Sequence, residues 1–422
     1  MRWGSVLGIA LLLASCVPPP VLDLSRPIDP SLPVAELDVQ PLLDAQGVRV
    51  GIGVWHPSLQ FEAADEAWTA RYDVVLRAWK RDGRRIAAEQ SNERIITVDA
   101  VDATTTLQSD PVALTLNLKP GTYWITATVR DQQARTESVT GAIATVVERA
   151  TPYRVDVLKG TPLAPVFSRT LLADGQPVHV RIRTDARAAF QVEVARAELA
   201  LRPASPPAAG RVSPSPLTWE PVAAQRSSAE TPEVDLDLGA LAEGAYRWQV
   251  RAGDRVVQSG TWVVRDVTFP VVTEWAEMVA ALSYIATPNE VAELQAAPSS
   301  ARRAVFDTFW QAGTRSRAEA TEAVQVFAER LEAANLRFSQ TRSGWQTDRG
   351  MMHIVFGPPF FIDRDYNSEV WQYRLDPASD RVTSFVFTRN TETGRWHLRR
   401  DPSYAALWDA AVQRWRTGRV QP

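Results

Sequence analysis

The stretch from Gly344 to Pro359 constrains the fold of this 422-residue chain most, because turn residues close a short apolar run on both sides. The polar part runs from Gly344 to Gly350, the apolar run covers 351–356, and Gly357-Pro358-Pro359 follows. Proline cannot continue a strand ladder, so these last residues predict a turn. We therefore expect the end of a long helix, a polar turn, a buried strand at 351–356 and a second turn.

Local turn chemistry can explain each residue type at the start of this stretch. Gly344 stands where a left-handed residue would end the long helix. Trp345 can fill a gap in a core, and the side chains of Thr347 and Asp348 can bond turn amides. On this interpretation the stretch is structural, and five residues carry it: Gly344, Gly350, Gly357, Pro358 and Pro359.

A second interpretation is that the same stretch lines a groove for a peptide, a glycan or a protein partner. Tryptophan and arginine are favoured anchors at interfaces. The exposed faces of residues 342–373 would then carry the binding, with His353 beside them. The candidate binding residues are Trp345, Thr347, Asp348, Arg349 and Trp371.

The chain around this stretch is predicted to form an α+β domain at 271–422. Thr287-Pro288-Asn289-Glu290 is a capping box, and apolar residues three or four apart predict the longest helix at 317–338. Strands are expected at 370–375, 381–387 and 395–398, and a closing helix after Asp401-Pro402. Helices followed by strands favour helices packed on a small antiparallel sheet.

Residues 36–150 and 151–270 read as β-structure, with short apolar or alternating runs between turn residues. Each contains Leu-x-x-Gly-x-Tyr after a strand, from Leu118 to Tyr123 and from Leu241 to Tyr246. This pattern resembles the tyrosine corner of immunoglobulin-like sandwiches, where the phenol bonds backbone. The chain is therefore predicted to be multidomain: two tandem immunoglobulin-like β-sandwiches followed by the α+β domain. One larger β-domain is the alternative, and Pro203–Pro216 is expected to be an exposed loop.

The N-terminus has the pattern of a targeting segment. Arg2 precedes an apolar run at 6–13, which is too short to span a bilayer. Leu13-Ala14-Ser15-Cys16 resembles the lipobox of bacterial lipoproteins, which implies a signal peptide at 1–16 and a lipid, such as palmitate, on Cys16. A proline-rich tether at 17–35 would follow, and Val17 favours the outer membrane. An ordinary secretory signal or a buried cysteine is the alternative.

Composition gives little indication of a ligand. The net charge is −3, so no global field favours nucleic acid. Among the 46 basic residues only Lys80, Lys119 and Lys159 are lysines, and the arginines are scattered along the chain. We interpret this as a genomic bias.

No known catalytic or metal-binding motif occurs in the sequence. The four histidines are isolated, and the stretch from Asp363 to Glu369 only starts like a calcium loop, with Ser368 in place of the required glycine. We predict no catalytic residue, no metal and no cofactor. The enzyme alternative is a cell-wall or glycan hydrolase that pairs Asp348 with Glu369 or Asp363, since paired carboxylates cleave glycosidic bonds.

The stretch from Gly344 resembles the GWxTD-domain family of bacterial envelope proteins, whose motif stands here as Gly344, Trp345, Thr347 and Asp348. The resemblance covers about residues 274–400 and includes Phe309-Trp310, Ala334-Asn335 and the Gly357-Pro358-Pro359 turn. The chain departs from the family at 311–314, where an acidic Asp-Pro element is usual. The resemblance implies an envelope protein but no particular reaction.

These observations predict a non-catalytic envelope lipoprotein, a binding or scaffold module of the outer membrane that acts through its GWxTD domain. Its partners would be the membrane, through the N-terminal lipid, and an unidentified envelope protein or cell-wall component, but not nucleic acid. The sequence leaves open whether the motif binds a partner or only shapes the fold.

Overall fold

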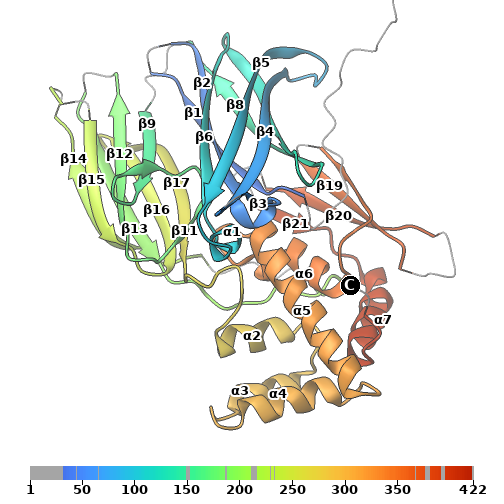
Figure 1. Ribbon diagram of the computed structural model, residues 1–422. Helices are drawn as coiled ribbons and strands as arrows, with labels where there is room; N and C mark the ends of the chain where they lie inside the picture. Colours follow the sequence, from blue (N-terminus) through green and yellow to red (C-terminus); the bar gives the residue numbers. More distant parts are fainter. Residues whose placement is uncertain are drawn as a thin grey trace, which may run out of the picture.

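The computed structural model describes residues 32–420, apart from 44, 65, 149–152, 186–187, 211–215, 229, 232, 366, 376–380 and 391–394. The predicted signal peptide, Cys16 and residues 17–31 of the tether lie outside the described residues. Three hydrophobic cores follow one another along the chain. In Figure 1 the first strands are blue and cyan, the next are green and yellow, and the C-terminal helices and small sheet are orange and red.

Two sheets enclose the first core. One has the order β1-β2-β6, and the other has the order β3-β4-β7-β8 with β5 also paired to β4. Alternate residues point inward, so Val50, Ile52 and Val54 of β2 meet Tyr72, Val74 and Leu76 of β4, all fully buried. The elements are β1 (Ala35–Pro41), β2 (Gly47–Trp55), η1 (His56–Ser58), β3 (Glu62–Ala64), β4 (Ala67–Lys80), β5 (Ile86–Val98), α1 (Asp102–Thr105), β6 (Ser109–Asn117), β7 (Gly121–Asp131) and β8 (Thr136–Val146).

Two further sheets enclose the second core, in the orders β10-β9-β12-β15 and β11-β17-β16-β13-β14. Neighbouring strands are antiparallel except for β11, which pairs parallel with β17. In β15 the side chains alternate between the core and solvent, because Val234 and Leu236 are buried while Asp235 and Asp237 are exposed. The elements are β9 (Tyr153–Lys159), β10 (Ala164–Pro165), β11 (Thr170–Leu172), β12 (Pro177–Thr184), β13 (Gln191–Ala197), β14 (Glu220–Arg226), β15 (Glu233–Ala240), β16 (Gly244–Ala252) and β17 (Arg255–Arg265).

The two repeated tyrosines make the bond that the sequence pattern predicts. The Tyr123 hydroxyl donates to the carbonyl oxygen of Lys119 at 2.8 Å, and the Tyr246 hydroxyl donates to that of Ala242 at 2.8 Å. Both rings are buried, so each phenol closes the turn before its strand from inside the core. The repeat therefore has the same local geometry in both β-regions.

The third core lies between helices and the antiparallel sheet β18-β19-β20-β21. The predicted capping box at Thr287 is present, and the predicted long helix matches α5. No helix in the described part of the chain is long and apolar enough to cross a membrane. The elements are α2 (Trp275–Leu282), α3 (Pro288–Ala296), α4 (Arg302–Gln311), α5 (Arg317–Phe338), η2 (Gly344–Gln346), α6 (Asp348–Phe356), β18 (Phe361–Arg364), β19 (Ser368–Tyr373), β20 (Thr383–Arg389), β21 (Trp396–Leu398), η3 (Pro402–Tyr404) and α7 (Ala405–Arg416).

The predicted strand at 351–356 is wrong, because these residues lie in the helix α6. The Thr347 hydroxyl caps this helix by accepting from the Gly350 N–H at 3.0 Å, and Gly357 ends it with a φ of 82°. All residues from Gly350 to Val355 are buried. A helix that is buried on every side has no polar face, so its sequence shows no helical period and is easily taken for a buried strand.

We expect the Tyr246→Phe substitution to lower the free energy of unfolding by about 0.5 to 1.5 kcal/mol, because it removes one buried hydrogen bond and little volume. Chemical denaturation of the full-length protein would measure this loss. Tyr404→Phe is the matched control, because among the described residues the Tyr404 hydroxyl has no hydrogen-bond partner. Equal effects of the two substitutions would show that the Tyr246 bond adds nothing to stability.

Candidate functional site

The turn at Gly344 lies directly against α5 because this residue has no side chain. A Cβ atom at Gly344 would stand 1.8 Å from the carbonyl oxygen of Ala334, and one at Gly350 would stand 1.9 Å from the carbonyl oxygen of Gly344. Gly344 does not have a positive φ, so the expectation that it ends the long helix in a left-handed conformation is wrong. Both glycines permit close backbone contact, which no larger residue allows.

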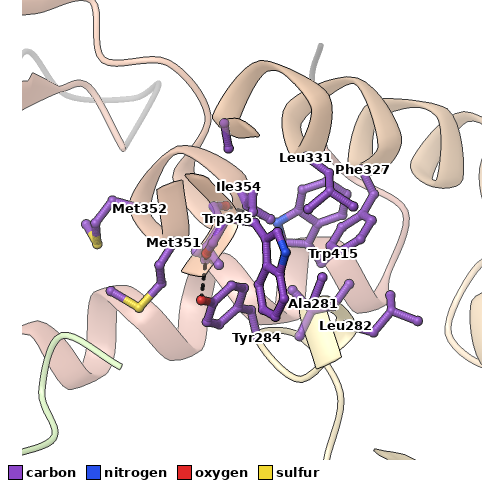
Figure 2. Close-up of a cluster of buried hydrophobic side chains, with 14 of the residues drawn as sticks. Ala281, Leu282, Tyr284, Phe327, Leu331, Trp345, Met351, Met352, Ile354 and Trp415 are labelled. Atoms are coloured by element: carbon purple, nitrogen blue, oxygen red, sulfur yellow. Dashed lines mark hydrogen bonds between the residues drawn. The ribbon is translucent and has the colours of Figure 1, made fainter. Parts of the chain in front are cut away.

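Trp345 is a core residue and not a surface anchor. Its side chain is fully buried and its indole N–H donates to Glu277 of α2 at 2.7 Å. Its carbonyl oxygen accepts from the Tyr284 hydroxyl at 2.8 Å, the dashed line in Figure 2, which shows the indole among side chains of several helices. Trp371 is also fully buried, so the expectation that these two tryptophans are exposed anchors is wrong.

Thr347 and Asp348 connect the motif to neighbouring elements. Besides capping α6, the Thr347 hydroxyl donates to the Gly344 carbonyl oxygen at 2.7 Å. The buried Asp348 carboxylate accepts from the Leu398 N–H at 2.8 Å and from both terminal nitrogens of Arg400 at 2.7 and 3.1 Å. Asp348 therefore holds the β21 end of the sheet against the start of α6.

Arg349 belongs to an ion-pair cluster in which Glu369 pairs with both Arg349 and Arg364. Its guanidinium lies 3.2 Å from Glu369 and between the rings of Phe338 and Trp396, at 5.1 and 5.3 Å from their centroids. Burial lowers the pKa of Arg349 to about 10, against the effect of the Glu369 charge. Burial alone would raise the pKa of Glu369, but Arg364 and Arg349 outweigh it and hold that pKa below its usual range.

A segment of the second β-region, 200–207, docks on the motif. The Gln346 amide donates to the Ala200 carbonyl oxygen at 2.6 Å, and the Tyr284 hydroxyl accepts from the Ala204 N–H at 2.8 Å. Arg400 donates to the Ser205 carbonyl oxygen at 2.9 Å. The sequence indicated only an exposed loop here, and proline-rich composition carries no signal of what such a loop contacts.

An arginine-lined pocket of about 130 Å³ opens between this segment and the motif. It shares Phe338, Arg349 and Trp396 with a pocket of about 300 Å³ beside the first β-region. It shares Arg202, Thr341, Arg342 and Gln346 with a pocket of about 290 Å³ beside the second. We call these three neighbouring hollows the motif groove. The arginines of its central pocket are Arg202, Arg342, Arg349, Arg395 and Arg400.

The predicted binding residues divide into two sets. Thr347, Asp348 and Arg349 line the central pocket, whereas Trp345 and Trp371 lie in the core below it. His353 is buried in α6 against the Phe338 ring, away from the groove. Sequence reasoning missed Arg202, Arg342, Arg395 and Arg400, which are far apart along the chain and only meet in the fold.

The stretch from Asp363 to Glu369 does not assemble oxygen ligands. Asp365 accepts from the N–H groups of Asn367 and Ser368, both at 2.7 Å, which is turn chemistry. Glu369 points instead to Arg349 and Arg364. Within the described residues no group of three His, Cys, Asp or Glu side chains is placed to hold a metal ion.

Residues 246–417 match the family model described as GWxTD domain. None of the curated proteins matches the chain. Among solved structures, the chain is similar to red sea bream transglutaminase, with 11% identity, 55% of this chain and 31% of that chain covered, and a TM-score of 0.18.

Two other similar structures have the same TM-score of 0.18. The C-terminal domain of the Streptococcus pyogenes antigen I/II-family protein AspA has 9% identity, with 56% of this chain and 100% of that chain covered. Escherichia coli alpha-2-macroglobulin activated by porcine elastase has 13% identity, with 57% of this chain and 24% of that chain covered. This chain thus spans less than a third of the transglutaminase and of the macroglobulin, and likenesses this distant carry no functional argument.

We expect Gly344→Ala to lower the free energy of unfolding by at least about 3 kcal/mol, because the new methyl group would overlap the α5 backbone. Gly210→Ala is the control, since a Cβ there meets nothing within 4 Å, and its effect should stay within about 0.5 kcal/mol. Urea denaturation would compare them. A mild effect at Gly344 would contradict the close packing.

His353 makes stability depend on pH. Burial, with the charges of Arg330 and Arg337, lowers its pKa to about 3. In the unfolded chain the value is about 6.5, so between these pH values only the unfolded state gains the proton, and stability falls as pH falls.

We therefore expect His353→Leu to gain stability relative to the unmodified protein as the pH is lowered from 6 to 5, by up to about 1.4 kcal/mol per pH unit. Denaturation curves of both proteins at pH 7.5, 6 and 5 would measure the difference. A difference that does not change with pH would mean that His353 has the same pKa in the folded protein as in the unfolded chain.

Proposed function

Since the chain contains a GWxTD domain at residues 246–417, we propose that it is a non-catalytic binding or scaffold module of the bacterial cell envelope that acts through this domain. The motif groove is the ligand site in this proposal. Its central pocket brings five arginines together, Arg202, Arg342, Arg349, Arg395 and Arg400, in a chain whose net charge is −3. This local concentration of positive charge is the observation that carries the proposal.

A scaffold role is supported by what the motif already does within the chain. Gln346, Tyr284 and Arg400 bond main-chain atoms of the segment 200–207, as a domain does when it holds an extended peptide. Arg337 donates in the same way to the Leu32 carbonyl oxygen, at the end of the predicted tether, at 3.2 Å. The domain thus collects two segments from outside itself around one groove.

The hydrolase alternative has less support. Asp348 and Glu369 each lie in ion pairs with arginine, Asp348 with Arg400 and Glu369 with Arg349 and Arg364. A general acid needs a raised pKa, but the pKa of Glu369 is lowered. Asp363 is exposed on β18, so it offers no sheltered partner. We therefore do not propose catalysis by these carboxylates.

We further propose that the two β-regions are immunoglobulin-like sandwiches that space the GWxTD domain from the membrane. The paired tyrosine bonds and the two sheets around each core support this assignment. The lipid on Cys16 and the outer-membrane location rest on the sequence of the N-terminus. With this lipid and this location, the proposed protein is an envelope module that is tethered to the outer membrane.

In-cell crosslinking followed by pull-down of the full-length protein tests this function. We expect specific crosslinked partners with the unmodified protein, and at least about a tenfold loss with the double variant Arg342→Glu and Arg395→Glu, because like charges repel an anionic partner. Circular dichroism and a melting curve establish that the variant is folded.

The matched control is Arg81→Glu with Arg84→Glu, two exposed arginines at the turn between β4 and β5, which changes the net charge equally. This control should retain every partner. If the groove variant retains them too while folded, the groove is not the binding site and the proposed function fails.

A further inference from the structure

The connection between β13 and β14 is much longer than these strands need. The two strands pair antiparallel, with Arg196 opposite Glu220, yet the chain between them covers residues 198–219. Antiparallel neighbours are usually joined by about two to five residues, and much longer connections usually belong to functional loops or to linkers. The first part of this loop, the segment 200–207, bonds residues of the GWxTD domain. The extra length of the loop therefore serves a contact outside the second β-region.

Three buried side chains of the GWxTD domain form what we call the peptide row: Tyr284, Gln346 and Arg400. Tyr284 and Gln346 are each 4% exposed, and the Arg400 side chain is 11% exposed. Their bonds to the segment reach main-chain atoms, namely the carbonyl oxygens of Ala200 and Ser205 and the N–H of Ala204. Main-chain bonds do not depend on the side chains of the bound segment, so a different peptide can make them.

The GWxTD motif holds each member of the peptide row in place. The Trp345 carbonyl oxygen accepts from the Tyr284 hydroxyl, as Figure 2 shows. Gln346 is itself the variable residue of the motif, and its amide oxygen accepts from the main-chain N–H three residues earlier at 3.2 Å. The Asp348 carboxylate binds both terminal nitrogens of Arg400. The motif thus sets the direction of the bond that each side chain offers to a peptide.

The segment 200–207 fills the peptide row but buries few of its own side chains. Ala204 packs against the third core and Pro207 is buried, whereas Leu201 is 47% exposed and Pro206 is exposed. A buried polar group without a partner destabilises the fold, so the row favours a bound peptide. Because few side chains of the segment are buried, a second peptide with the same main-chain bonds can replace it.

The prolines of the segment stand where the peptide row needs no N–H. Pro203, Pro206 and Pro207 lack this group, and the one N–H that the row accepts belongs to Ala204. Proline also restricts φ, which reduces the entropy that a peptide loses when it binds. The row therefore suits a proline-rich peptide with a small residue, other than proline, at the position of Ala204.

We propose that the peptide row is a binding site for a proline-rich peptide of a partner protein, and that the segment 200–207 occupies it as an internal ligand until the partner displaces it. This inference rests on the proposed function, since it names the chemistry of the partner that the GWxTD domain binds. The site lies at the edge of the motif groove, because Gln346, Arg400 and Ala204 also line the central pocket.

Fluorescence anisotropy with a labelled peptide of residues 198–209 tests the proposal on the full-length protein. The internal segment competes with this peptide at an effective concentration on the order of 1 mM. Ala204→Pro in the protein removes the N–H that Tyr284 accepts, and so releases the segment. For a peptide Kd of about 0.1 mM, we expect this variant to bind the peptide about tenfold more tightly than the unmodified protein does.

Two matched controls test the peptide row itself. The same peptide with N-methylalanine at the position of Ala204 loses only the N–H, and it should bind at least about tenfold more weakly. In the Ala204→Pro protein, Gln346→Ala should weaken peptide binding several-fold, because it removes the donor to the Ala200 carbonyl oxygen. Gln176→Ala, at an exposed position between β11 and β12, should leave the affinity unchanged.

Three results overturn the proposal: no peptide binding to the folded Ala204→Pro protein, equal affinity of this variant and the unmodified protein, or equal affinity for the methylated and unmethylated peptides. A melting curve establishes that the variant is folded. If it is not, Ala204→Glu releases the segment instead, because a carboxylate cannot replace the methyl group that packs against the core.

Size-exclusion chromatography distinguishes a partner protein from a second copy of this chain. We expect the unmodified protein and the Ala204→Pro variant to elute as monomers. A dimer of the unmodified protein that Ala204→Pro abolishes would mean that the segment of another copy fills the peptide row. That result would overturn the proposal of a partner peptide.

In-cell crosslinking separates this proposal from the proposed function. If crosslinked partners depend on the charge of the motif groove while the peptide fails to bind the Ala204→Pro protein, the peptide proposal falls and the binding function stands. If the peptide binds as expected but no partner is crosslinked, the peptide row stands as a binding site and the proposed envelope function falls.

Discussion

The C-terminal domain depends on the close contact between the backbones of Gly344 and Ala334, which brings the turn η2 against the helix α5. This contact inserts Trp345 into the core, where Glu277 and Tyr284 bond its polar atoms. It also sets where Thr347 can cap α6, and therefore where that helix points. A side chain at Gly344 would separate the two backbones, and all of the later contacts would be lost together.

The same turn divides the domain into an apolar side and a charged side. Below it lies a core of large aromatic side chains, and above it Asp348 and Arg349 emerge at the start of α6 and reach β21 and β19. Buried charges are tolerated when they are paired, and Asp348 with Arg400 and Glu369 with Arg349 meet this condition. Arg342 has no ion-pair partner among the described residues, and burial lowers its pKa where it lines the central pocket.

Much of the fold could be predicted because it follows from local rules. The capping box at Thr287, the three-four spacing along α5 and the alternation in β15 each depend on neighbouring residues alone. The strand predicted at 351–356 is wrong because a helix buried on all sides shows no period. Tryptophan is a residue type that is common at interfaces, and only the packing around Trp345 and Trp371 shows that both side chains are fully buried in the core.

The sequence by itself determined the order of β-regions and helices, the turn chemistry of the Gly-Trp-x-Thr-Asp stretch and the two tyrosine bonds, because each arises between residues close along the chain. Only the tertiary structure decided the candidate site. Arginines that look scattered at positions 202, 342, 395 and 400 face one pocket, because α5, β21 and a distant loop pack around the same turn. Charge at a site depends on distances in space, and separations along the chain do not determine those distances.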